Sequence, residues 1–169
     1  MKRIYPKNKE KFKELIPYAK KIIKLCKANR IPVAIYGSFG HFYHTRDEKI
    51  KVNDIDLLIP ERCNKKMIGL LEKKGIKFKQ VSKESIVTKD GKLKVEVDNI
   101  GKGYKNIKEK LFSSRGFPVG DFYGLNVGIM KLKHYEEMYP VAYKRSRDDK
   151  ARILKRIRHL EKYLGRKLL

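Results

Sequence analysis

The stretch Val33–Ile59 reads VAIYGSFGHFYHTRDEKIKVNDIDLLI, and it contains two short apolar runs separated by a polar connection. The second run, Ile55–Ile59, contains Asp56 and directly follows Asp54. A run of this length predicts a buried strand, and strand alternation places Asp54 and Asp56 on one face, about 7 Å apart. Two carboxylates this close repel each other, and both gain from a shared divalent cation. The pair therefore predicts a metal site.

The first apolar run, Val33–Tyr36, ends in Gly37-Ser38 and is followed by Phe39–His44, which we predict to be a short helix. Backbone N–H groups at the start of a helix, together with a serine hydroxyl, suit phosphate oxygens. A phosphate-binding turn and paired carboxylates are the two halves of a site for phosphoryl or nucleotidyl transfer. Gly-Ser and Asp-x-Asp are each common in proteins, so the inference depends on their order in the chain and on the apolar strands next to them.

Gly37-Ser38 followed by Asp54-Ile55-Asp56 resembles the signature of the polymerase-β-like nucleotidyltransferase superfamily, which includes small antibiotic and minimal prokaryotic nucleotidyltransferases. The resemblance covers about Pro32–Ile100. It implies a third carboxylate on a neighbouring strand, and Lys94–Val97 fits that strand with Glu96 as the acid. Asp98 lies on the same face by alternation and is the alternative.

The resemblance implies an α/β (α+β) fold, with a short mixed β-sheet flanked by helices and a C-terminal helical pair. It implies transfer of a nucleoside monophosphate from an NTP, with ATP the expected nucleotide, to an acceptor hydroxyl, with release of pyrophosphate. Asp54, Asp56 and Glu96 are then the expected catalytic residues and the ligands of two Mg²⁺ ions. Gly37 and Ser38 are expected to hold the β- and γ-phosphates.

Three basic residues near the C-terminal helix junction, Lys144, Arg147 and Lys150, correspond loosely to residues that small members of the family place close to the triphosphate. The resemblance implies that they bind nucleotide phosphates, and an ordinary solvated surface is the alternative. Ser146–Asp149 is predicted to be a capping box that opens the final helix.

The length of the chain and the spacing of its apolar residues predict one domain, with a core over residues 1–130 and a helical segment over 131–169 packed on it. Apolar residues at helical spacing predict an N-terminal helix, which Pro17 is expected to kink or divide in two. Lys89-Asp90-Gly91 predicts a β-hairpin turn. Gly101–Gly128 is rich in glycine and aromatic residues, and we expect a long irregular stretch there that selects the acceptor. A last strand is expected over Leu125–Met130.

The chain has 43 Lys and Arg residues against 19 Asp and Glu, a net charge of +24 over 169 residues. A surface this positive attracts polyanions, so RNA or a similar polymer is an expected partner besides the NTP. Lysine enrichment in heat-adapted proteins is the alternative, but that enrichment is usually balanced by glutamate. The charge also fits another function, a noncatalytic nucleic-acid-binding protein or a toxin–antitoxin partner.

The sequence has no apolar run approaching the ~18 residues of a membrane span and no N-terminal signal pattern, so we expect a cytoplasmic protein with no membrane partner. Cys26 and Cys63 have no metal-binding spacing, and we expect them to be reduced thiols.

Overall fold

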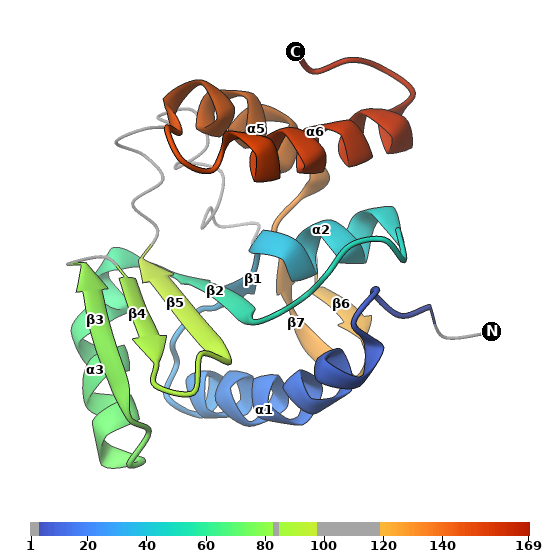
Figure 1. The fold of residues 1–169 in the computed structure, drawn as a ribbon. Coiled ribbons are helices and arrows are strands. Elements are labelled where there is room, and N and C mark those ends of the chain that lie inside the picture. Colours follow the sequence, from blue (N-terminus) through green and yellow to red (C-terminus); the bar gives the residue numbers. More distant parts are fainter. Residues whose placement is uncertain (1–3, 83–84, 98–118) are drawn as a thin grey trace. The chain divides into compact units, whose positions relative to one another are not determined.

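The computed structural model describes residues 4–82, 85–97 and 119–169 (Figure 1). The described chain forms two compact units, residues 1–130 and residues 131–169. The first unit contains the β-sheet and the second is a pair of helices. Among the described residues, none of the helices has an apolar stretch long enough to span a bilayer.

The sheet of the first unit has seven strands in the described part of the chain, in the order β3-β4-β5-β2-β1-β7-β6. Its central pairs are mixed, because β1 runs antiparallel to β2 but parallel to β7, and β2 runs parallel to β5. The outer pairs are antiparallel hairpins. The predicted mixed sheet is therefore confirmed. The strands are β1 (Ala34–Ile35), β2 (Ile55–Ile59), β3 (Phe78–Ser82), β4 (Ser85–Thr88), β5 (Leu93–Val97), β6 (Val119–Phe122) and β7 (Leu125–Ile129).

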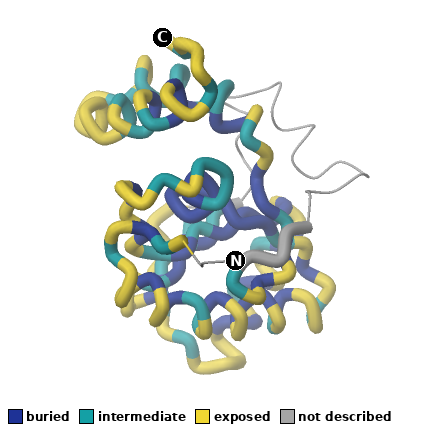
Figure 2. The backbone as a smooth tube through the Cα atoms, turned by 90° about the vertical axis from the view of Figure 1, so that its right-hand side faces the viewer, coloured by how far each residue is buried: buried dark blue, intermediate teal, exposed yellow. Residues whose placement is uncertain are grey.

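Helices of the first unit pack with the sheet into one apolar core. Phe12 of α1 lies at its centre, with its ring edge-on to Phe39 at 5.1 Å and to Phe42 at 5.8 Å between centroids. The core-facing strand residues Ile55 and Leu57 are fully buried in the same cluster, and Figure 2 shows the buried backbone in dark blue. The helices are α1 (Lys9–Ala28), α2 (Gly37–Thr45), the 3-10 helix η1 (Glu61–Cys63) and α3 (Asn64–Lys73).

The second unit consists of α5 (Leu132–Arg145) and α6 (Lys150–Leu164), which pack against each other. Ile157 and Leu160 of α6 and Tyr135 of α5 are buried. An ion pair between Arg166 and Glu136 joins the chain after α6 to α5. The predicted C-terminal helical pair is confirmed.

Pro17 does not divide the N-terminal helix in two, which was one of the two outcomes expected from the sequence. α1 continues through Pro17 as one helix, and α5 continues through Pro140. The exposed position of Pro17 places its ring on the solvent side, where loss of one backbone hydrogen bond is compensated most easily by water. Asn64 is the first residue of α3 and directly follows η1.

The β4–β5 and β6–β7 hairpins differ in how well the sequence predicted them. The turn at Asp90-Gly91 is confirmed, with Gly91 at φ +67° and the Asp90 carboxylate accepting a 3.0 Å hydrogen bond from the Lys92 N–H. A last strand was expected over Leu125–Met130 and is found as β7, but β6 was missed because an irregular loop was expected there, so the β6–β7 hairpin was not predicted. It turns at Tyr123-Gly124, where both residues have positive φ, as in the type I′ turn that matches strand twist.

The two cysteines are free and buried, as predicted. The Cys26 Sγ lies 3.9 Å from the Met67 Sδ in the core between α1 and α3. Burial, followed by the nearby Cys63 thiol, raises the pKa of Cys26 to about 12. A thiol held protonated in this way is a poor nucleophile, so Cys26 is a packing residue.

Candidate functional site

The parallel pairing of β2 with β5 decides which charged residues meet. In this register Asp56 lies opposite Lys94, and Leu58 lies opposite Glu96. Paired residues project from the same face of a sheet, so Asp56, Lys94 and Glu96 share one face. Their neighbours in sequence, such as Leu57, are buried in the core on the other face. The core therefore orients the strands, and the charged residues project from the opposite face.

Lys94 lies among the carboxylates. It forms an ion pair with Glu96, and both side chains are about one third exposed, 36% for the lysine and 31% for the glutamate. Burial by itself would lower the pKa of Lys94. The hydrogen bond and charge of Glu96, followed by the charges of Asp56 and Asp54, outweigh burial and raise it. The charges of all three carboxylates thus favour the protonated form of a single ammonium group.

Tyr36 connects this cluster to the turn after β1. Its hydroxyl donates a hydrogen bond to the Glu96 carboxylate, and its backbone N–H donates a 3.0 Å bond to the carbonyl of Asp56. Because β2 lies between β1 and β5, the Tyr36 side chain extends across β2 to reach Glu96. The Glu96 carboxylate is thus held by two groups, the Tyr36 hydroxyl and the Lys94 ammonium.

Gly37 brings the start of α2 against Asp56. Its φ is +62°, and a Cβ at this position would lie 2.6 Å from the Cγ of Asp56 and closer still to Oδ2. Glycine is therefore required twice, by the left-handed backbone and by the close approach. Ser38, next in α2, is 5% exposed. The first turn of α2 and the Asp56 carboxylate consequently form a single site.

Most of the residues predicted from the first motif come together here. The charges of Asp56 and Asp54 raise the pKa of Lys94, and Glu96 forms an ion pair with it. The backbone at Gly37 packs closely against Asp56. The alternative third carboxylate, Asp98, lies outside the described residues.

Two residues of the cluster, Tyr36 and Lys94, were not assigned a role from the sequence. Alternation had placed Lys94 on the face of Glu96, which was a usable signal. Nothing local in the sequence indicated that Tyr36 reaches Glu96, because the contact joins residues sixty positions apart.

Carboxylate oxygens such as those of Asp54, Asp56 and Glu96 are suitable ligands for a hard divalent cation, because such ions prefer oxygen ligands. Asp54 and Asp56 satisfy this requirement, and Asp56 lies beside the turn at Gly37. Within the described ranges, however, no three His, Cys, Asp or Glu side chains are placed as one ready-made metal site. Glu96 is instead engaged by Lys94 and Tyr36. The ammonium of Lys94 thus partly neutralises the charge that a metal ion would neutralise.

The basic residues predicted near the triphosphate belong to the second unit. Lys144 is in the last turn of α5, and Arg147 is in the connection to α6. Lys150 is the first residue of α6, and its Nζ lies 5.7 Å from the centroid of the Tyr143 ring. All three are exposed. Their part in phosphate binding stays a prediction.

The predicted capping box at the same junction is found in part. The Asp149 N–H donates a 2.9 Å hydrogen bond to the Ser146 Oγ, but α6 begins only at Lys150. Asp149 also pairs with Arg152. The loop expected to select the acceptor falls largely within residues 98–118, outside the described residues.

Solved structures of ANT(2″)-Ia, an aminoglycoside nucleotidyltransferase, are similar to this chain. A crystal structure of ANT(2″)-Ia in complex with adenylyl-2″-tobramycin has a TM-score of 0.60 and 14% identity, over 90% of each chain. A solution structure of this antibiotic-resistance factor has a TM-score of 0.58 and 15% identity, over 90% of this chain and 83% of that one. No family model and no curated protein matches the sequence. The likeness shows the fold, which the Gly-Ser and Asp-x-Asp motifs had predicted.

Proposed function

We propose, on the premise that the chain has the fold of the polymerase-β-like nucleotidyltransferases, that it transfers a nucleoside monophosphate from an NTP to an acceptor hydroxyl. One observation carries this proposal: the turn at Gly37 packs against the Asp56 carboxylate, and Asp56 pairs across the strands with Lys94, which forms an ion pair with Glu96. A helix start suits phosphate groups and neighbouring carboxylates suit divalent cations, and phosphoryl and nucleotidyl transfer require both at one place.

In the proposed reaction, the acceptor oxygen attacks the α-phosphorus of the NTP. A new P–O bond forms there, the bond between the α-phosphorus and the bridging oxygen breaks, and pyrophosphate leaves. The acceptor hydroxyl loses its proton to a carboxylate, for which Glu96 is the candidate. The first turn of α2, with Gly37 and Ser38, would hold the β- and γ-phosphates. Lys144, Arg147 and Lys150 would add positive charge near them.

Asp54 and Asp56, with Glu96 as the third acid, would hold two Mg²⁺ ions. Bound there, the ions would lower the pKa of the acceptor hydroxyl and neutralise charge on the phosphates. Lys94 has a separate role in this proposal: it compensates the negative charge of the carboxylates and keeps Glu96 in place. Tyr36 orients the same carboxylate through its hydroxyl.

ATP is the proposed nucleotide, and the adenylyl product bound to the similar structure supports this choice. The test is to incubate the protein with each labelled NTP, Mg²⁺ and one acceptor at a time. RNA, protein, simple alcohols and aminoglycosides cover the acceptor classes. Transfer of label with one nucleotide, accompanied by pyrophosphate release, is the expected result. Absence of transfer with every pair would favour a noncatalytic binding protein.

Glu96→Gln is expected to lower the rate of transfer by about 10² to 10⁴, the range of a lost general base. Gln cannot accept the proton, but its size preserves the hydrogen bond from Tyr36. Transfer is measured as above at saturating NTP.

Asp98→Asn is the matched control for this prediction, because it removes an acid two residues further along the chain. It is expected to leave the rate nearly unchanged. The opposite ranking of the two variants would transfer the role of third carboxylate to Asp98.

A further inference from the structure

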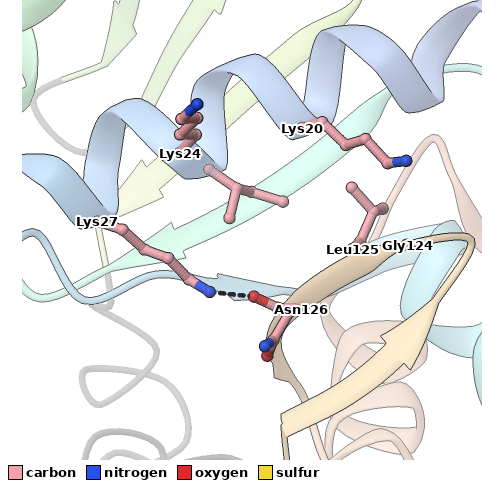
Figure 3. A pocket seen from close by; sticks show the side chains of 7 residues that line it. Lys20, Lys24, Lys27, Gly124, Leu125 and Asn126 are labelled. Atoms are coloured by element: carbon pink, nitrogen blue, oxygen red, sulfur yellow. Dashed lines mark hydrogen bonds between the residues drawn. The ribbon is translucent and has the colours of Figure 1, made fainter.

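A basic groove lies in the first unit between α1 and the β6–β7 hairpin. It encloses about 280 Å³ and is lined by Lys20, Lys24 and Lys27 of α1 and by Leu125 and Asn126 of β7. Figure 3 shows the three lysines on α1 and the hairpin residues facing the helix. None of these residues belongs to the candidate nucleotidyltransferase site.

The turn of the hairpin leaves room for a lysine. Gly124 has φ +72°, and a Cβ there would lie 2.7 Å from the Lys20 Nζ. At the other end of the groove, the Lys27 ammonium donates a hydrogen bond to the backbone carbonyl of Asn126. The groove thus has Lys20 beside the turn of the hairpin and Lys27 bonded to Asn126 at the other end, with Lys24 between them in sequence.

The charge of α1 is divided unequally along its length. The first half contains Glu10 and Glu14, and Lys13 pairs with Glu10. From Lys20 to Lys27 the helix has lysines but no acidic residue. No carboxylate is among the described residues that line the groove. A lysine in the last helical turn is favourable for the helix itself, but this effect fades beyond that turn and does not account for Lys20.

We propose that this groove binds the phosphodiester backbone of a nucleic acid. Lys24 and Lys27 lie about 6 and 10 Å from Lys20 along the helix axis, so a linear polyanion can contact all three. A duplex carries one charge per about 1.7 Å of its axis, a density that acidic protein segments seldom reach. The net charge of +24 would attract such a polymer over a long range.

A membrane surface fits the groove less well. Helices that bind membranes insert an apolar face into the lipid. The apolar residues of α1, including Leu15, Ile22 and Ile23, are buried in the core and are not available for insertion. The proposal holds whether or not the protein transfers nucleotides, because it concerns different residues and a binding event.

The test is the triple variant Lys20→Gln, Lys24→Gln and Lys27→Gln. Binding of a labelled RNA of about 20 nucleotides is measured without NTP by fluorescence anisotropy at several salt concentrations. Loss of three phosphate contacts should reduce the log–log salt slope by about 2 and weaken binding by about 10- to 100-fold near 0.1 M salt. The same measurement with DNA of equal length shows whether the sugar matters, as lysine contacts to phosphate alone should not distinguish the two.

The matched control is Lys65→Gln, Lys66→Gln and Lys73→Gln, which removes the same charge from exposed positions of α3. It is expected to change binding less than threefold. A double variant of Lys20 and Lys24 spares the Lys27 bond to Asn126, so a loss of affinity there cannot come from a displaced hairpin. Equal losses in the triple and control variants would overturn the proposal, as would absence of RNA binding at 50 mM salt. Stronger binding to polyglutamate or to anionic vesicles than to RNA would also overturn it.

Discussion

Asp56→Asn and Asp54→Asn are each expected to abolish nucleotidyl transfer, with a loss of about 10³-fold or more. Asparagine is close to aspartate in size but lacks the charge that a divalent cation requires. Loss of a metal ligand removes at least about 4 kcal/mol of transition-state stabilisation. The measurement is the rate of label transfer with saturating NTP and Mg²⁺, alongside thermal unfolding of each variant.

The fold should survive both substitutions, because the two side chains are only half-buried and project from the face opposite the core. Asp47→Asn is the matched control: it removes one negative charge but preserves the oxygen that accepts the 2.9 Å bond from the Lys49 N–H. It should retain full transfer. Near-full turnover by either Asp54→Asn or Asp56→Asn would show that the two carboxylates are not metal ligands.

Gly37→Ala is expected to cost about 2 to 5 kcal/mol of unfolding free energy and to eliminate transfer. The left-handed backbone at φ +62° accounts for about 1 to 2 kcal/mol for a residue with a side chain. Overlap of the new methyl group with Asp56 adds a packing cost of about 1 to 3 kcal/mol. Relief of that overlap requires displacement of a candidate metal ligand. Urea unfolding and the transfer assay measure the two effects.

Gly75→Ala separates the two causes. Gly75 has nearly the same backbone conformation, φ +64°, but nothing lies within 4 Å of a Cβ built there. Its variant should show the backbone cost alone and retain activity. If Gly37→Ala destabilised the protein no more than Gly75→Ala does, the contact between the start of α2 and Asp56 would be wrong.

The local sequence by itself determined the strands that form the site. Ile55–Ile59 became β2 with the bounds expected from its apolar run, because a run this short and rich in branched apolar side chains favours a buried strand over a helix. Gly37-Ser38 became the start of a helix, and Asp90-Gly91 became a turn. In each case the signal lies within a few residues, and the physical preference it expresses is equally local.

Local preferences failed where packing opposed them. Pro17 was expected to kink its helix or divide it in two, but residues on both sides of it, such as Leu15 and Ile22, are buried in the core and stabilise one continuous helix. β6 was missed because two of its four residues, Gly120 and Asp121, are poor strand formers. Its pairing with β7 provides the stability that its own sequence lacks.

The arrangement of the site was decided by tertiary structure alone. The parallel register of β2 and β5 sets Asp56 opposite Lys94, and the order of the strands lets Tyr36 reach Glu96 across β2. Such contacts join residues far apart in the chain, and they follow from how the strands bury their apolar faces together, which no single stretch of sequence encodes. The carboxylates could thus be recognised from their spacing, whereas the ammonium and hydroxyl groups that hold Glu96 became apparent only in the folded chain.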